Sequence, residues 1–246
     1  MFLSKTGGLK RFTENVYALS ILLLVLIGLA SMNVFAGPQR ALGASGADTL
    51  TQGNRSTYTT KNASTANDSA QGGYIVELNL TVQSQSNKWQ GYWGNINGNI
   101  LLSDEIGAVF YRWAWNTTNG SGEVYATENS TVTWTNVAVG NAEALKYVGG
   151  SAQTNQSDSA NQTFQSLTNV TVGNTTLNNV PSTQTFNSTN SSAFEMGIVR
   201  SGNDNFIFGR IYNDRTNFKG VASDYQLMVP TPEASRATYF FFVELS

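Results

Sequence analysis

The chain contains neither histidine nor cysteine, and this absence closes most routes to catalysis by side chains. A Ser-His-Asp triad, a thiol nucleophile, and a metal site of imidazole or thiolate ligands all need one of these residues. Glycoside hydrolysis remains open, because it needs only a pair of carboxylates around the scissile bond. The sequence does not show that any two of the glutamates in predicted strands face each other: Glu77, Glu123, Glu195 and Glu244. We therefore interpret the acids as solvated or ion-paired groups, and we expect neither enzyme activity nor a cofactor.

Two polar loops carry oxygen atoms of the kind that calcium prefers, at residues 201–205 and 213–215. Neither loop has the alternating acidic residues of a dedicated calcium site. Arg200, Arg210 and Arg215 lie beside them and favour ion pairs instead. The sequence therefore predicts no metal site.

Aromatic residues are a second kind of candidate, because an exposed row of rings can stack on sugars. Trp89, Tyr92 and Trp93 surround a glycine-rich turn, and Trp113 and Trp115 lie two apart on one predicted strand face. The alternative is that these large rings fill the core. We favour the core for Trp113 and Trp115, place Trp93 near the surface, and keep Trp89, Tyr92 and Trp93 as candidate sugar-stacking residues.

Asn-x-Ser/Thr triplets, the acceptor motif of N-glycosylation, occur thirteen times, about twice as often as 27 Asn and 51 Ser and Thr would give by chance. A composition rich in these residues is the competing explanation. Asn129 and Asn169 lie close to predicted strands, which makes them weaker candidates. The expected glycosylation sites are Asn54, Asn62, Asn67, Asn79, Asn116, Asn119, Asn155, Asn161, Asn174, Asn187 and Asn190.

The first 36 residues have the pattern of an export signal. Lys5, Lys10 and Arg11 precede an apolar stretch, Val16–Phe35. Cleavage after Val34–Ala36 would release a secreted protein, whereas an uncleaved stretch of this length would anchor the chain in a membrane as a helix. Both interpretations place the rest of the chain outside the cell. No basic run is present, so a nucleic-acid partner is not expected.

The remaining chain divides into a linker and one domain. Residues 37–73 are almost free of large apolar side chains, which predicts a disordered polar linker. From residue 74 the pattern changes to period-two alternation over ten residues, which predicts a half-buried strand. Its inward side chains would be Tyr74, Val76, Leu78, Leu80 and Val82. Residues 74–246 are therefore predicted to form a single folded domain.

Short predicted strands without intervening helices favour an all-β fold, an antiparallel two-sheet β-sandwich of jelly-roll type. Asn97-Gly98 predicts a tight hairpin between residues 92–96 and 99–103. Residues 141–147 could form two helical turns, and residues 149–192 are predicted to contain long exposed loops. Further strands are expected at 108–115, 123–126, 132–134, 164–172, 193–199, 206–212, 225–229 and 238–245.

The block Trp89-Gln90-Gly91-Tyr92-Trp93-Gly94-Asn95-Ile96-Asn97-Gly98-Asn99-Ile100, continued by Leu102 and Asp104, resembles a motif of exported archaeal proteins that are rich in Asn and Thr. Later segments, such as 194–198 and 224–230, match the layout of the same family. The resemblance covers about residues 70–246. It implies an archaeal cell-surface β protein, and it carries no activity or binding residues.

Three functions remain open at this point. The first is a glycosylated structural or interaction protein of the cell surface, such as an envelope or filament subunit that associates with copies of itself. The second is a carbohydrate-binding or adhesive module that uses the aromatic cluster. The third is a pilin-like subunit whose apolar helix forms a filament core. Gly37 and Pro38 argue against it, because they would end the apolar helix soon after Phe35.

Overall fold

The computed structural model describes residues 44–59, 67–147, 156–232 and 235–246, which belong to one compact unit. The apolar stretch 16–35 and its expected cleavage site lie outside the described residues. Within the described ranges, no helix is both long and apolar enough to span a membrane. The all-β prediction is confirmed, because every paired strand is antiparallel and the helical elements of these ranges are short. These elements are η1 (Trp134–Asn136), η2 (Ala142–Ala144) and α2 (Ala160–Thr163).

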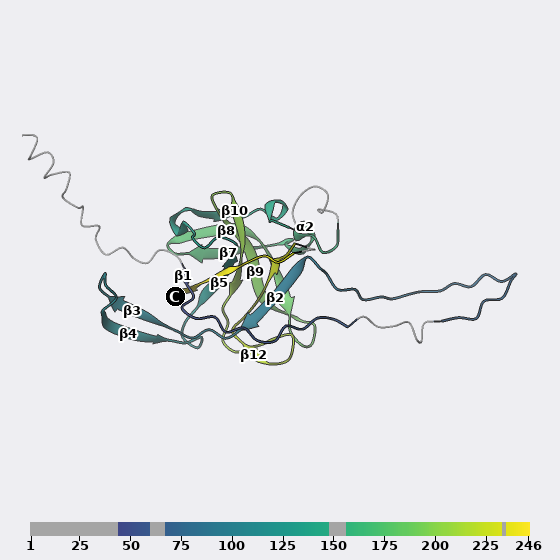
Figure 1. The fold of residues 1–246 in the computed structure, drawn as a ribbon, viewed down its shortest axis with the longest axis horizontal. Helices are drawn as coiled ribbons and strands as arrows, with labels where there is room; N and C mark the ends of the chain where they lie inside the picture. Colours follow the sequence, from purple (N-terminus) through teal and green to yellow (C-terminus); the bar gives the residue numbers. More distant parts are fainter. Residues whose placement is uncertain (1–43, 60–66, 148–155, 233–234) are drawn as a thin grey trace, which may run out of the picture. The chain divides into compact units, whose positions relative to one another are not determined.

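The main sheet joins eight strands, and seven of them follow one path in the order β1-β14-β5-β10-β9-β8-β7 (Figure 1). The eighth strand, β6, pairs with β9 beside the end of β8. The bounds are β1 Ser45–Gly46, β5 Gly122–Thr127, β6 Val137–Val139, β7 Ser166–Val172, β8 Thr175–Phe186, β9 Ser192–Ser201, β10 Asp204–Arg210 and β14 Phe240–Leu245.

Three smaller ladders complete the strands of the described residues. β2 (Trp89–Gly94) pairs with β13 (Tyr225–Pro230), and β3 (Gly98–Ser103) pairs with β4 (Val109–Trp115). The short strands β11 (Arg215–Thr216) and β12 (Ala222–Ser223) form the third ladder.

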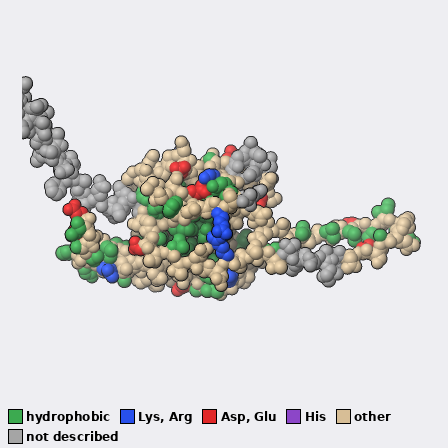
Figure 2. All heavy atoms as spheres, viewed as in Figure 1, with side chains coloured by type: hydrophobic (Ala, Val, Ile, Leu, Met, Phe, Trp, Pro, Cys, Tyr) green, Lys and Arg blue, Asp and Glu red, His purple; other side chains and the backbone are tan. Residues whose placement is uncertain are grey.

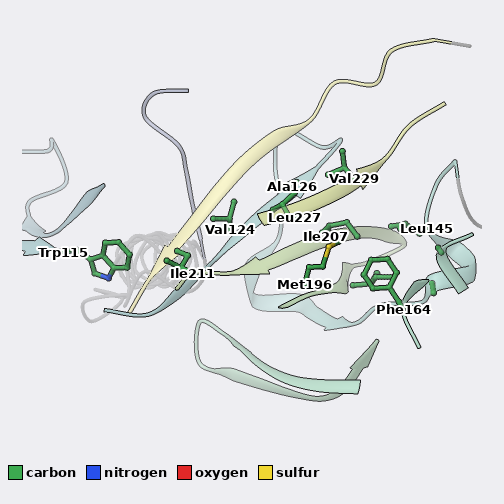
Figure 3. Close-up of a cluster of buried hydrophobic side chains, with 13 residues drawn as sticks. Trp115, Val124, Ala126, Leu145, Phe164, Met196, Ile207, Ile211, Leu227 and Val229 are labelled. Carbon is green, nitrogen blue, oxygen red and sulfur yellow. The ribbon is translucent and has the colours of Figure 1, made fainter. Parts of the chain in front are cut away.

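Alternation along the central strands buries side chains on both faces of the main sheet. On one face, Val124 and Ala126 of β5 and Ile207 of β10 pack with Leu227 and Val229 of β13, so the β2–β13 ladder lies over this face (Figure 3). On the other face, β5 and β10 bury Tyr125, Phe206 and Phe208, together with Val199 of β9 and Phe242 of β14.

The main sheet curls so strongly that β7 approaches strands three positions away. Neighbouring strands lie about 4.8 Å apart, so β10 and β7 would be separated by about 14 Å in a flat sheet. Yet Arg210 of β10 donates hydrogen bonds to the carbonyl oxygen of Asn169 and to Thr168 in β7. The turn between β7 and β8 reaches β14 as well, where the backbone N–H of Gly173 donates to Glu244 Oε1 at 2.7 Å. The curled β7–β8 hairpin therefore covers the second face.

The hairpin predicted at Asn97-Gly98 is wrong in its pairing. β2 pairs with β13, far along the chain, while β3 turns back into β4. Asp104 organises this second turn, because its Oδ1 accepts the N–H groups of Ile106 and Ala108. β2 pairs with β13 and not with β3, because Leu227 and Val229 of β13 are buried in the core and the pairing places β2 beside them.

The prediction of long exposed loops within residues 149–192 is also wrong for the described part. Residues 166–186 form the β7–β8 hairpin, whose buried side chains include Val170, Val172, Leu177 and Val180. β7 confirms the strand expected at 164–172, whereas β8 was missed because Thr and Asn fill most of its outward positions.

Two local expectations differ by a few residues. The strand expected at 132–134 lies a few residues later, at β6, and Trp134 is instead the first residue of the 3-10 helix η1. Residues 141–147 form only η2, in which Asn141 Oδ1 accepts the N–H of Glu143.

The segment 74–83 is not the half-buried strand that its alternation predicts. No ladder within the described residues includes it, and its five alternating apolar side chains are 62–87% exposed. A strand needs a neighbour for its backbone N–H and C=O groups, and none of the described strands lies beside this segment as a partner.

Candidate functional site

Three of the four glutamates in predicted strands come together at one end of the curled sheet. Glu123 of β5 and Glu195 of β9 flank Arg210 of β10 as cross-strand neighbours. Arg210 Nη1 lies 3.4 Å from Glu123 Oε1, and Arg210 Nε donates to Glu195 Oε2. Glu244 lies on the adjoining strand β14, in register with Glu123. The fourth glutamate, Glu77, is exposed on the segment 74–83.

Hydrogen bonds hold the third carboxylate of this cluster in place. The hydroxyl of Tyr125 donates a hydrogen bond to Glu244 Oε2 at 3.1 Å, and the backbone N–H of Gly173 donates one to Glu244 Oε1. Burial raises the pKa of Glu123 to about 7; Arg210 opposes this effect and Glu244 reinforces it. Burial also raises the pKa of Tyr125 above its ordinary value.

This cluster has the residues of an acid–base pair but not the setting of a catalytic site. Arg210 is shared by two carboxylates, and both acids are largely buried. The described hollow of about 190 Å³ lies elsewhere and is lined by residues such as Asn129, Thr133, Asp204 and Phe206. Within the described ranges, no group of three or more acidic, His or Cys residues could hold a metal ion. The cluster joins β5, β9, β10, β14 and β7, so its physical effect is to lock the curl of the sheet.

Of the flanking arginines considered in the calcium loops, Arg210 forms the expected ion pairs, while the other two make different contacts. Arg200 donates to the carbonyl oxygens of Val139 and Gly202. The guanidinium of Arg215 lies over the Tyr212 ring, 3.5 Å from its centroid.

The candidate sugar-stacking residues do not form a common platform. Trp89 packs on Phe164, with ring centroids 6.0 Å apart, and its Nε1 donates to the carbonyl oxygen of Asp158. Tyr92 meets Phe241 edge-on at 5.1 Å. Both rings are therefore partly buried against the core.

Trp93 is near the surface, as predicted. It is 40% exposed and meets Phe218 edge-on at 6.1 Å, with Lys219 Nζ 5.8 Å from its ring centroid. A single exposed ring offers one stacking position, not a row.

The two tryptophans of β4 have different environments. Trp115 is buried, as predicted, and its Nε1 donates to the carbonyl oxygen of Ser246 at 3.4 Å. Trp113 is exposed, so the core prediction is wrong for this residue. It lies two positions further from the base of the β3–β4 hairpin, on a face that no other strand of the described chain covers.

This uncovered face of β3–β4 is the largest feature that sequence reasoning missed. Ile100 lies opposite Trp113 and Leu102 opposite Tyr111, so all four point to one side of the ladder. We call these four residues the hairpin face. They are 41–55% exposed, and the rings of Tyr111 and Trp113 are 4.8 Å apart. The sequence did contain a sign of this face: residues 100–102 and 109–111 are apolar at every position, whereas a strand with one buried face needs apolar residues only at every second position.

Figure 2 shows hydrophobic side chains facing solvent on β3–β4 and along the segment 74–83. We call residues Tyr74–Gln83 the alternating segment. Both surfaces consist of exposed apolar side chains on β-prone sequence, and neither is covered by another strand of the described residues. A soluble chain rarely exposes such surfaces unless another molecule covers them.

The asparagines of the acceptor triplets are accessible wherever the structure describes them. Ten are exposed and Asn187 is half-buried; Asn62 and Asn155 lie outside the described residues. Asn187 shapes its own turn, because its Oδ1 accepts from both the N–H and the hydroxyl of Thr189. Asn129 and Asn169 are as exposed as the others, so burial does not separate them from the expected sites.

Comparison of the chain with protein-family models, with curated proteins and with solved structures finds no match. Among the described residues, the two uncovered β surfaces are the features that most clearly suggest an interaction with another molecule.

Proposed function

We propose that this protein is an exported, N-glycosylated structural subunit of the cell surface that functions by assembling with other chains. The observation that carries the proposal is the pair of uncovered apolar β surfaces, the hairpin face and the alternating segment. A protein that worked alone in water would gain nothing from exposing both, and each would promote uncontrolled aggregation.

Accessible acceptor asparagines support the surface location. A glycan needs an exposed attachment point in water, and ten of the described acceptor residues offer one. The basic and apolar pattern of residues 1–36 supports export. The resemblance of residues 70–246 to archaeal surface proteins points in the same direction. In this proposal the domain is the expected two-sheet sandwich, with the β2–β13 ladder as the start of its second sheet.

The chemistry of the buried glutamates supports a structural role over an enzymatic one. Glu123 and Glu195 each pair with Arg210 through one oxygen, and both oxygens of Glu244 accept hydrogen bonds, from Tyr125 and Gly173. A catalytic carboxylate pair must instead flank an open position for a sugar.

The test is electron microscopy of the protein isolated from its native host, combined with mass spectrometry of its N-terminus and glycopeptides. The expected result is an ordered assembly whose subunits carry glycans on several acceptor asparagines, Asn116 and Asn174 among them. Unmodified asparagines on a monomeric intracellular protein would contradict the proposal.

Carbohydrate binding is the second candidate, and one observation favours it at a new position. Tyr111 and Trp113 form an exposed pair of rings on the hairpin face, whereas Trp89 and Tyr92 pack on phenylalanines. Calorimetric titration with oligosaccharides would show binding that Trp113→Ala removes and Trp93→Ala retains.

A further inference from the structure

The alternating segment has the sequence of a strand and the surroundings of a loop. Its apolar side chains are 62–87% exposed, and the hydrogen bond from Asn79 to Glu77 at 3.0 Å stays within the segment. An exposed strand sequence of this kind can be completed by adding to a free edge of another sheet, where the ladder satisfies its backbone.

The β3–β4 hairpin supplies a free edge. It is a two-stranded ladder, so the outer edge of β4 has no partner among the described strands. The hairpin face is apolar, and the reverse side of β4 carries Arg112, opposite Leu101. A third strand beside β4 would continue both faces of this ladder.

Within one chain, the alternating segment and the β3–β4 hairpin are attached to opposite ends of β2. The alternating segment stops six residues before Trp89, where Lys88 is fixed by a 2.5 Å ion pair with Asp158. The hairpin begins after the opposite end of β2. At the base of the hairpin, Trp115 Nε1 donates a hydrogen bond to the carbonyl oxygen of Ser246. Six residues of strand span about 20 Å, and β2 pairs with β13 along its whole length. The two surfaces therefore leave the core at different ends.

We propose that the alternating segment of one copy binds as a third strand along β4 of the next copy. This inference deepens the proposed function, because it states how the surface subunit assembles. Two different, complementary surfaces at separate ends of a subunit give head-to-tail contacts, which link subunits into an open chain, or into a ring where the rotation between copies closes.

Charge and side-chain pattern fix one register for the added strand. An antiparallel strand that places Glu77 opposite Arg112 also places Val76 opposite Trp113 and Leu78 opposite Tyr111. Opposite-charge pairs and aromatic–aliphatic pairs across strands are both favourable. The polar face of the added strand, with its acceptor Asn79, would remain in water, so a glycan there is compatible with assembly.

The reach and the size of the contact are sufficient. Fifteen residues separate Tyr74 from Trp89, and an extended chain of that length spans about 50 Å. Specific interfaces bury about 1,200–2,000 Å² in total. The apolar side chains of the two surfaces are 41–87% exposed, so the backbone and polar side chains of the added strand would supply the rest of such an area.

The absence of cysteine makes a direct test clean. Two full-length single-cysteine variants, Glu77→Cys and Arg112→Cys, are prepared separately, mixed and oxidised. The expected product is a disulfide-linked pair of chains that forms in the mixture, and in much lower yield from either variant alone. Mixing Glu77→Cys with Thr189→Cys, which places the second thiol on an exposed loop, is the matched control and should give little product.

The double variant Glu77→Cys/Arg112→Cys separates assembly from pairing within one chain. Our proposal expects ladders of linked chains on a non-reducing gel. A product that migrates as a single internally linked chain would overturn the proposal, and so would equal yields from the test mixture and the control mixture.

A second measurement uses the apolar side of the segment. Leu78→Asp should weaken association about 10- to 100-fold in sedimentation velocity, as expected for the loss of one buried leucine. Thr81→Asp adds the same charge on the polar side and should leave association nearly unchanged. If Leu78→Asp assembles as well as the unmodified protein, the segment is not the contact, although a glycosylated surface assembly through another interface would survive as the proposed function.

Discussion

The buried position of Glu123 predicts an unusual dependence of stability on pH. Its pKa is about 7 in the folded protein and 4.5 for an unperturbed glutamate. Between these values the folded chain holds a proton that the unfolded chain has released. The contribution of this group to stability is therefore fully present below pH 4.5 and is lost as the pH rises through 7. One pKa unit corresponds to about 1.4 kcal/mol, so the difference of roughly 2.5 units amounts to about 3 kcal/mol.

Glu123→Gln tests this reasoning, because glutamine has the same shape and cannot ionise. Urea unfolding followed by tryptophan fluorescence at several pH values from 4.5 to 8 gives the free energy of unfolding. The unmodified protein should lose stability across this window, and the variant should lose about 3 kcal/mol less. The chain has no histidine, so no imidazole titration overlaps the window.

Glu143→Gln is the matched control, because Glu143 is an exposed glutamate on η2. It should reproduce the pH dependence of the unmodified protein. An unchanged slope in Glu123→Gln would refute the argument, because it would mean that the folded protein does not hold the extra proton at this carboxylate.

Three further substitutions test other parts of the fold by urea unfolding. Arg210→Met should destabilise the protein by about 3–5 kcal/mol at pH 8, because it leaves two largely buried carboxylates without their cation, and by less at pH 5; equal losses at both pH values would contradict this. Gly122→Ala should cost about 1–3 kcal/mol, since Gly122 has a φ of 154° and an added Cβ would overlap a carbonyl oxygen of β14, whereas Gly91→Ala meets open space and should be near neutral. Phe208→Ala should cost about 3–5 kcal/mol by opening a cavity in the second core face, whereas Phe110→Ala removes an exposed ring and should change stability little.

Local pattern predicted much of this fold because local pattern determines which face of a strand is buried. The strands around residues 123–126, 193–199 and 225–229 formed where they were expected, since their apolar residues recur at the spacing of a strand. β8 was missed because Leu177 and Val180 are too widely spaced among Asn and Thr to show the pattern.

Pairing could not be predicted in the same way, because it depends on residues far apart in the chain. Asn97-Gly98 has the local chemistry of a tight turn, yet β2 pairs with β13. The cluster of Glu123, Glu195 and Arg210 has the same origin: each residue is unremarkable in its own strand, and the strand order brings them together. Alternation at residues 74–83 indicated strand propensity but could not reveal that no strand of the described residues pairs with it.

The place of β14 in the main sheet has a consequence for the order of events during biosynthesis. β14 is the last strand of the chain, yet it lies between β1 and β5, with all of β6 to β13 intervening in the sequence between β5 and β14. Each of its ladder contacts is thus non-local, and such contacts form late because a long loop must first close. Until β14 has been synthesised, Val124 and Tyr125 have no neighbour on one side. The main sheet therefore stays incomplete until β14 is available, which is compatible with the proposed export, because an incompletely folded chain can pass through a narrow translocation channel.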